Sequence, residues 1–253
     1  MKKNIKMIVC DLDGTLLTDE KTVAPRTLAA FEKCRSLGIK VAFATGRGQS
    51  AKELVPVELF DGYAINNGGS AFVGESRIYC KVMTHDMYAG LVKKLVESGA
   101  KASIVIDEEH FLNFHAPAEW KGFEYTIAEL TELNRDALKI WALTDEPWVE
   151  EVVKAHVTED MFLYIARDGI ALVSHKDAVK SKAVAAMAGH FGIASEEIVV
   201  FGDDMNDIDM FAYAGTAVAM GNAVDEVKAA ADMICGTNEE DGIAKWLEAW
   251  IDE

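Results

Sequence analysis

Residues 5–17 read IKMIVCDLDGTLL, and this stretch decides the fold. Residues 5–10 form an apolar run that predicts a buried β-strand, and the acids Asp11 and Asp13 follow at its end. Buried strands of this kind belong to parallel sheets, whose ligands bind beyond the carboxyl ends of the strands. Residues two apart on an extended chain point the same way, so Asp11 and Asp13 can face one site.

The acidic pair has three interpretations at this point. One carboxylate can attack phosphorus while the other moves protons. A plain Asp-Gly turn at Asp13-Gly14 explains the residues equally well. A calcium loop fits poorly, because Leu16 interrupts the required pattern and Thr22 stands where the closing Glu should be.

Apolar runs alternate with amphipathic helical patterns at both ends of the chain. Strands are predicted at residues 40–44, 63–66, 198–201 and 216–220, and helices at 25–37, 180–191, 208–212, 223–231 and 243–250. This alternation predicts an α/β fold, a Rossmann-like parallel sheet with helices on both faces.

The middle of the chain has a different order of elements. A helix, two strands, an irregular segment, a strand, a helix and two strands are predicted, the last two joined by a hairpin turn at Arg167-Asp168-Gly169. We therefore expect an α+β cap domain, residues 83–177, inserted into a catalytic core of residues 1–82 and 178–253.

Polar residues follow two further strands of the predicted core. Residues 44–47 read ATGR, where a hydroxyl and a backbone N–H can bind phosphate oxygens. Residues 202–207 read GDDMND, and three acids within five residues are costly beside a buried strand unless a cation binds there. Asp11, Asp13, Asp203 and Asp207 should meet at one sheet edge, where Mg²⁺ fits as a hard cation that takes oxygen ligands.

Composition excludes several classes of function. The net charge is -17 and no Lys/Arg-rich stretch exists, which argues against nucleic acid and anionic membranes as partners. The four cysteines form no CxxC pair, and the N-terminal apolar run is too short for a signal peptide, so a cytoplasmic location is expected. The expected partner is a small phosphorylated metabolite, bound by a monomer or weak homodimer.

The three motifs together resemble the haloacid dehalogenase superfamily, specifically its Cof-like phosphatases. The matching segments are DLDGTLL at 11–17, ATGR at 44–47 and GDDMNDIDMF at 202–211, and the runs at 218–223 and 240–244 also resemble this branch. The middle segment is similar to the family's type II cap in position, length and element order. The resemblance implies hydrolysis of phosphate monoesters, such as sugar phosphates, with Mg²⁺ and an aspartyl-phosphate intermediate.

The resemblance also implies a role for each matching residue. Asp11 is the nucleophile, Asp13 the acid and base, and Lys180 the catalytic lysine, although Ser181 stands where this branch usually has Gly. The implied phosphate contacts are Thr45, the Gly46 amide and Asn206. Leu12 and Arg47 are further candidates for phosphate binding, although Arg47 could instead form a structural ion pair. The implied metal ligands are Asp11, the Asp13 carbonyl and Asp203. Asp207 does not bind the metal directly but supports these ligands.

Helical spacing gives an independent argument for Lys180. Lys180, Val184, Met187 and Phe191 share one stripe of the predicted helix, so Lys180 should point inward while Lys182 faces solvent. Lys176 precedes the helix and is less constrained.

Several alternatives stay open. A phosphomutase of the same superfamily would share the site, and residues 46–51 match the dinucleotide fingerprint GxGxxA, though after the second strand. A catalytically silent metabolite sensor is disfavoured by the complete acidic set. His110 and His115 could hold a second metal, and Trp120, Trp141 and Trp148 could line a pocket. A solvated loop and core packing, respectively, are favoured for these two groups.

Overall fold

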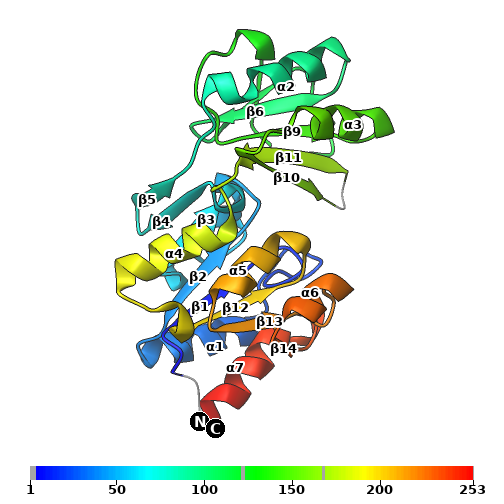
Figure 1. Ribbon diagram of the computed structural model, residues 1–253. Helices are drawn as coiled ribbons and strands as arrows, with labels where there is room; N and C mark the ends of the chain where they lie inside the picture. Colours follow the sequence, from blue (N-terminus) through cyan, green and yellow to red (C-terminus); the bar gives the residue numbers. More distant parts are fainter. Residues whose placement is uncertain (1–3, 121–122, 167–168, 253) are drawn as a thin grey trace. The chain divides into compact units, whose positions relative to one another are not determined.

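The computed structural model describes residues 4–120, 123–166 and 169–252. Contacts within the chain divide it into two compact units. The first contains the residues up to Cys80 and those from Val179 onward, and the second contains Lys81–Ala178 (Figure 1). The second unit is thus an insertion in the sequence of the first, which we call the core unit. We call the inserted one the cap unit.

The core unit is built on one eight-stranded sheet with the order β14-β13-β12-β1-β2-β3-β4-β5. The strand β1 (Met7–Cys10) lies in its middle, parallel to both neighbours, with Cys10 opposite Phe201 and Phe43. The other parallel strands are β2 (Lys40–Ala44), β3 (Gly62–Ile65), β12 (Ile198–Gly202), β13 (Thr216–Ala219) and β14 (Met233–Ile234). Every residue of β1 is buried, as its continuous apolar run predicts.

One edge of this sheet is antiparallel, which the sequence analysis did not anticipate. β4 (Ser70–Val73) pairs antiparallel with β3, and β5 (Ser76–Cys80) pairs antiparallel with β4. The β4–β5 connection is a tight turn in which Gly74 has a φ of +57°, a conformation that glycine adopts without strain. The core is therefore a mixed sheet with a parallel centre.

Helices cover the core sheet in pairs. α1 (Pro25–Ser36) packs against α7 (Gly242–Asp252), and α4 (Lys180–Phe191) packs against α5 (Ile208–Tyr213), while α6 (Asp225–Ala230) contacts α5 (Figure 1). α1 begins with Pro25 in its first turn, and α4 ends at Gly192, whose φ of +67° is the left-handed cap that the sequence predicts. No helix in the described residues has the length and apolar character needed to cross a membrane.

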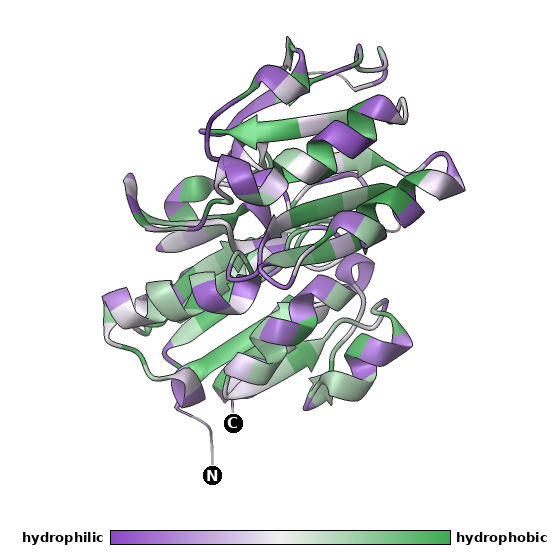
Figure 2. Cartoon of the chain, turned by 45° about the horizontal axis from the view of Figure 1, so that its top comes forward, coloured by the Kyte–Doolittle hydropathy of each residue, from purple (hydrophilic) through white to green (hydrophobic). Residues whose placement is uncertain are grey.

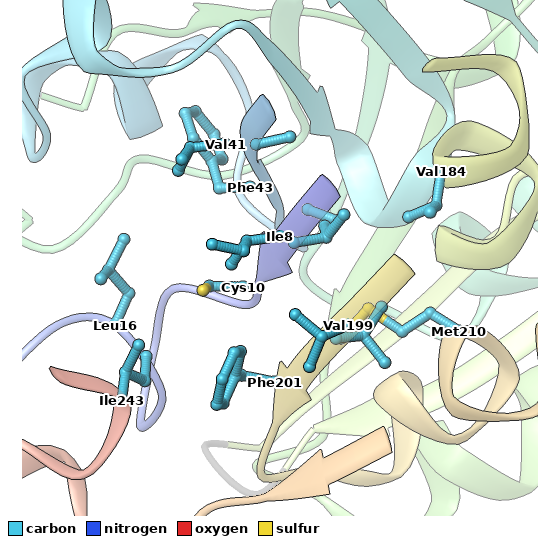
Figure 3. Packing of buried hydrophobic residues seen from close by; sticks show 14 of the residues in the cluster. Ile8, Cys10, Leu16, Val41, Phe43, Val184, Val199, Phe201, Met210 and Ile243 are labelled. Carbon is cyan, nitrogen blue, oxygen red and sulfur yellow. The ribbon is translucent and has the colours of Figure 1, made fainter. Parts of the chain in front are cut away.

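The central strands of the core sheet are mostly apolar, whereas the helices carry polar and apolar faces (Figure 2). The apolar faces and the strands share one buried cluster in the core unit. Figure 3 shows members of it from β1, β2 and β12, such as Ile8, Phe43 and Phe201, together with residues of α4, α5 and α7. This packing holds the carboxyl ends of the central strands in fixed positions.

The cap unit has a six-stranded sheet of its own, with the order β10-β11-β9-β6-β7-β8. Its strands are β6 (Ala102–Ile106), β7 (Glu109–Leu112), β8 (Thr126–Ile127), β9 (Lys139–Leu143), β10 (Met161–Ala166) and β11 (Ile170–His175), and its helices are α2 (His85–Glu97) and α3 (Pro147–His156). β10 and β11 pair antiparallel, as predicted. Of the predicted turn, Arg167 and Asp168 lie outside the described residues, and Gly169 donates a backbone hydrogen bond to Ala166.

Alternate residues of the cap strands face two separate apolar clusters. Ile140 and Ala142 join the cluster that contains the buried residues of α2 and α3, while Trp141 joins an aromatic group on the other face. Trp120 lies in the same aromatic group, and Trp148 packs at the edge of the helix-side cluster. The three tryptophans are therefore part of the packing of the cap unit, as favoured from the sequence.

Candidate active site

Ligands of open parallel sheets bind beyond the carboxyl ends of the strands, and three acids or hydroxyls follow the central strands here. Asp11 follows β1 directly, Thr45 follows β2, and Asp203 follows β12. Because these strands are parallel neighbours, their loops meet at one sheet edge. Lys180, the first residue of α4, points into the same place.

Lys180 is fully buried between two carboxylates. Its Nζ lies 2.5 Å from Oδ1 of Asp11 and 2.6 Å from Oδ1 of Asp207. Burial by itself lowers the pKa of Lys180, but the charges of Asp11 and Asp207 outweigh it and raise the pKa above the ordinary value. Lys180 is therefore a fixed positive charge beside the Asp11 carboxylate, and Lys182, two residues on, is exposed.

Asp207 fixes the conformation of the loop after β12 through hydrogen bonds. Its Oδ1 accepts from Lys180, and its Oδ2 accepts from the backbone N–H groups of Asp203 (2.9 Å) and Asp204 (3.1 Å). Both carboxylate oxygens of Asp207 are thus engaged by groups of the protein. The role of Asp207 in supporting a metal site stays a prediction, and these contacts are compatible with it.

Asp203 lies against the loop that follows β1. Its Oδ1 accepts a 2.9 Å hydrogen bond from the Thr15 hydroxyl. Gly14 approaches so closely that a Cβ at this position would lie 2.4 Å from Oδ2 of Asp203, and its φ is +79°. Burial, followed by repulsion from Asp207, raises the pKa of Asp203 to about 6.

The donor set suits a hard divalent cation. Asp11, Asp203 and Asp207 each offer a carboxylate oxygen within 4.8 Å of the others, and all three are buried. Burial raises the pKa of Asp11 well above its ordinary value and the charge of Lys180 opposes this, so a further cation would favour the ionised form. Because both oxygens of Asp207 are engaged, Asp11 and Asp203 are the carboxylates best placed to ligate Mg²⁺ directly. Within the described residues no other group of three such side chains exists, and His110 and His115 form none.

Asp13 sits apart from the buried acids, with a side chain 38 % exposed. Oδ2 of Asp13 accepts from Nε of Arg47 (2.5 Å), and Oδ1 accepts from Nη2 of Arg47 (2.7 Å) and Nζ of Lys21 (2.8 Å). Partial burial acts to raise the pKa of Asp13, but the hydrogen bonds from Arg47 and Lys21 lower it overall. The guanidinium of Arg47 thus forms an ion pair with Asp13, which was the alternative to a contact with substrate. Lys21 was missed because it belongs to no motif or period.

The remaining predicted phosphate contacts surround the end of β2. Thr45 is buried, and its Oγ1 accepts from the Arg47 backbone N–H at 3.2 Å. A Cβ at Gly46 would have no neighbour within 4 Å, so space for a ligand adjoins the backbone there. Asn206 donates from Nδ2 to Oδ1 of Asn67 at 3.0 Å. Leu12 is buried, and its backbone continues the turn after β1.

Two asparagines that the sequence analysis did not single out brace these loops. Asn67 has a φ of +56° and holds Asn206, and Asn222 donates from Nδ2 to the Gly14 carbonyl at 2.7 Å. Asn tolerates the left-handed conformation better than most residues, which would have been a sequence signal at Asn67.

The dinucleotide alternative finds no support in the geometry of residues 46–51. The segment that should form a helix is only a short 3-10 turn, Gln49–Glu53. A dinucleotide site needs an α-helix whose N-terminus meets the pyrophosphate.

Comparisons with known proteins bear on the family of the chain. The family model described as haloacid dehalogenase-like hydrolase matches residues 8–247. The chain is 28% identical to 5-amino-6-(5-phospho-D-ribitylamino)uracil phosphatase YitU of Bacillus subtilis, over 97% of both chains. It is 29% identical to pyridoxal phosphate phosphatase YbhA of Escherichia coli, over 96% of this chain and 97% of that protein.

A solved structure of a related protein also matches the chain. A sugar phosphatase of haloacid dehalogenase subclass IIB matches with a TM-score of 0.86 and 28% identity, over 97% of this chain and 98% of that chain. The family model and this likeness each extend over nearly the whole sequence, both the core unit and the cap unit. The chain belongs to the haloacid dehalogenase-like hydrolase family.

Proposed function

We propose that this chain is a Mg²⁺-dependent phosphatase that hydrolyses small phosphorylated metabolites through an aspartyl phosphate on Asp11. The observation that carries the proposal is the buried Asp11 carboxylate, held 2.5 Å from the fixed charge of Lys180 and beside Asp203. When ionised, the Asp11 carboxylate can act as a nucleophile. Lys180 and the loop after β12 restrict the movement of this carboxylate and so fix its orientation.

The reaction divides into two steps for the residues of this chain. In the first, an oxygen of Asp11 attacks phosphorus, and Asp13 gives a proton to the oxygen of the leaving alcohol. In the second, Asp13 takes a proton from water as the water oxygen attacks phosphorus, which releases phosphate and restores Asp11. Lys180 balances the negative charge of the phosphoryl group in both steps.

Three kinds of group would hold the phosphoryl oxygens. These are the hydroxyl of Thr45, the backbone N–H groups of Gly46 and Leu12, and the side-chain amide of Asn206. Each lies on a loop that follows β1, β2 or β12, or in the turn that begins after β12. Neutral donors of this kind stabilise the extra charge of the transition state without a large reorganisation.

Mg²⁺ would be held by Asp11, by the Asp13 backbone carbonyl and by Asp203, with Asp207 fixing the loop of Asp203. When bound, the ion offsets the repulsion between the carboxylate nucleophile and a phosphate dianion. The fit rests on the oxygen-only donor set and on the raised pKa of Asp203, which a nearby cation would lower.

The substrate class is proposed from the relatives together with the division of the chain. The relatives' names specify a ribitylaminouracil phosphate, pyridoxal phosphate and a sugar phosphate as substrates. The core unit holds every residue assigned above to catalysis, so we propose that the cap unit, predicted as residues 83–177, selects the alcohol part of the substrate.

Location and assembly are also proposals. Cys10, Cys34, Cys80 and Cys235 are free, which suits a reducing compartment, so we propose a cytoplasmic protein that acts as a monomer or weak homodimer. Light scattering and cell fractionation test these two points.

The test of the proposed function is release of phosphate from a panel of phosphate esters. The panel contains sugar phosphates, pyridoxal phosphate and p-nitrophenyl phosphate, each with Mg²⁺, with excess chelator, and with Mg²⁺ added back. We expect release that stops with chelator and returns with Mg²⁺. Full activity in chelator contradicts the metal assignment, and an isomeric sugar phosphate in place of free phosphate would identify a phosphomutase.

A further inference from the structure

The carboxylate of Asp13 is held by two cations from two different loops. Arg47, after β2, makes a two-pronged contact with both oxygens, which fixes the plane of the carboxylate. Lys21 adds a third bond, from Nζ to Oδ1 at 2.8 Å. Oδ1 therefore has two cationic partners, and Oδ2 has one.

Lys21 reaches Asp13 from a strained turn. Its φ is +60°, in the left-handed region that side chains with a Cβ rarely adopt. The turn is closed by backbone hydrogen bonds from Thr18 to Thr22 and from Lys21 to Thr18, each 2.9 Å, and by a 3.0 Å contact between the two threonine hydroxyls. Strain at a residue other than glycine persists only where the surrounding structure determines it, and it gathers at functional sites.

The turn that carries Lys21 is linked to the Asp13 backbone through isolated β-bridges. Leu17 forms one isolated bridge with Asp13 and another with Val23. The position of the Lys21 ammonium group is thus set by the short segment that begins at Asp13 itself. Exposed ion pairs contribute little when both long side chains must be ordered, and this frame reduces that cost for Lys21.

We propose that Lys21 is a positioning residue that, with Arg47, orients Asp13 as the acid of phosphoryl transfer. The three bonds fix the plane and the direction of the Asp13 carboxylate, because Oδ1 accepts from Arg47 and Lys21 and Oδ2 accepts from Arg47. This inference rests on the proposed function, because it concerns the acid of that reaction. Lys21 itself contacts no reacting atom in this account.

The consequence is a dependence on the leaving group. An alkoxide leaves phosphorus only as it receives the Asp13 proton, while the Asp11–phosphorus bond forms and the phosphorus–oxygen bond breaks. A p-nitrophenolate ion is stable enough to leave without that proton. The ratio kcat/KM reports the steps up to the loss of the leaving group, so a misplaced Asp13 lowers it for alkyl esters and spares it for the aryl ester. Lys21 acts to lower the pKa of Asp13, so its removal favours the protonated acid, and a loss on alkyl esters reports a misplaced carboxylate rather than a missing proton.

The experiment compares Lys21→Met, Lys21→Gly and Lys21→Arg on glucose 6-phosphate and p-nitrophenyl phosphate. Methionine and glycine both remove the charge, but glycine also removes the backbone strain. Lys6→Met is the matched control, since Lys6 makes a 2.7 Å ion pair with Glu197 and has a side chain 50% exposed, against 47% for Lys21. Asp13→Asn gives the pattern expected when the acid is absent.

We expect Lys21→Met and Lys21→Gly to lose about tenfold in kcat/KM on glucose 6-phosphate and less than about twofold on p-nitrophenyl phosphate, a fraction of what general acid catalysis contributes. Lys21→Arg should recover most of the loss, and Lys6→Met should change neither value. Asp13→Asn should show the same preference for the aryl ester to a larger degree.

Four results would overturn the inference. Equal losses on the two esters would mean that Lys21 acts on binding or folding rather than through the acid. Loss in Lys21→Met with full activity in Lys21→Gly would assign the effect to the backbone alone. If the wild-type protein releases phosphate from neither ester, the proposed function fails and this inference with it, whereas activity that depends on Asp13 but ignores Lys21 removes this inference only.

Discussion

Lys180 places a positive charge where no solvent reaches, at the start of α4 and between two carboxylates. A buried ion pair of this kind adds little net stability, because each charge has been taken out of water. Removing one partner lowers the stability strongly, because the remaining charges then stay buried without an opposite charge. The same residue can therefore be required for folding and for turnover, and the two effects must be measured separately.

We expect Lys180→Met to lose on the order of a hundredfold in turnover, the scale of one electrostatic stabiliser. It should also lower the free energy of unfolding by about 3–5 kcal/mol at neutral pH, because Asp11 and Asp207 lose their shared cation. Steady-state kinetics and urea unfolding measure the two quantities. Lys182→Met, an exposed position on the same helix, is the control and should be nearly silent. The reverse pattern would move the phosphate contact to Lys182.

The residues of the site differ in how far the sequence predicts them. The position of Lys180 follows from helical spacing, because its stripe also contains Val184 and Met187, which are buried. For Arg47 the sequence left open a substrate contact and a structural ion pair, and the partner in that pair could not be named, since a strand-end arginine has several carboxylates within reach. Lys21 depends on a turn whose backbone conformation is unusual for lysine, and no local pattern encodes that.

At the scale of elements, the loops after β1 and β12 fit against each other at Gly14. Gly14→Ala would place a Cβ 2.4 Å from Oδ2 of Asp203 and would strain a φ of +79°. We expect a loss of about 1–3 kcal/mol in the free energy of unfolding, of which the backbone term is about 1. The displaced Asp203 should also raise the Mg²⁺ concentration for half-maximal activity by about tenfold, the scale of a disturbed ligand support.

Gly38→Ala is the matched control for this change. Gly38 has a φ of +83°, but a Cβ there would meet nothing within 4 Å. Its alanine variant should show the backbone term alone, with an unchanged Mg²⁺ requirement. A raised requirement in both variants would mean that the metal site responds to general loss of stability rather than to Asp203.

A second prediction at this scale concerns β7 and β9 of the cap unit. Nε1 of Trp141 donates to Nδ1 of His110 at 3.3 Å, which requires a neutral imidazole. Burial, aided by the charge of Lys139, lowers the pKa of His110 to about 4. Between pH 6.5 and 4 the unfolded chain therefore binds a proton at this residue that the folded chain does not, so stability falls as the pH falls.

The contribution of His110 to this loss should be at most about 3 kcal/mol between pH 7 and pH 4. Denaturant unfolding of the wild-type protein and of His110→Phe across that range measures it. The variant should show a shallower dependence on pH, whatever its stability at pH 7. Parallel pH profiles for the two proteins would show that His110 has the same pKa in the folded and unfolded chains, which would contradict this account.

The elements themselves were predicted unevenly, for a physical reason. Long periodic helices and fully buried strands such as β1 and β2 carry a strong signal, and their bounds agree with the sequence to within a few residues. β14 has only two residues, and both are exposed. β5 is an edge strand with mostly exposed or half-buried residues, so neither strand has the apolar pattern by which strands are found.

At the scale of the whole molecule, the core unit and the cap unit bury separate apolar clusters. Each unit therefore has the interior that an independent domain needs. We expect that replacing residues 81–178 by a short Gly/Ser linker leaves a folded core that still hydrolyses p-nitrophenyl phosphate, to within about tenfold of the full chain, because no catalytic group is removed. Discrimination among the esters of the panel should be lost.

The linker variant is checked by circular dichroism and then by kcat/KM across the panel. A folded core with no activity on p-nitrophenyl phosphate would show that the cap unit takes part in the chemistry. Unchanged discrimination among sugar phosphates would show that specificity lies in the core unit instead.

The central claim is that Asp11 becomes phosphorylated. The most direct measurement mixes the Asp13→Asn variant with p-nitrophenyl phosphate and Mg²⁺, quenches with acid, reduces with borohydride and maps the peptides by mass spectrometry. Without the base that activates water, the phosphorylated enzyme should accumulate, and reduction of an aspartyl phosphate gives homoserine. We predict homoserine at position 11 and a burst of p-nitrophenolate equal to the enzyme present. An unmodified Asp11, with no burst from an enzyme that still releases phosphate, would contradict the account.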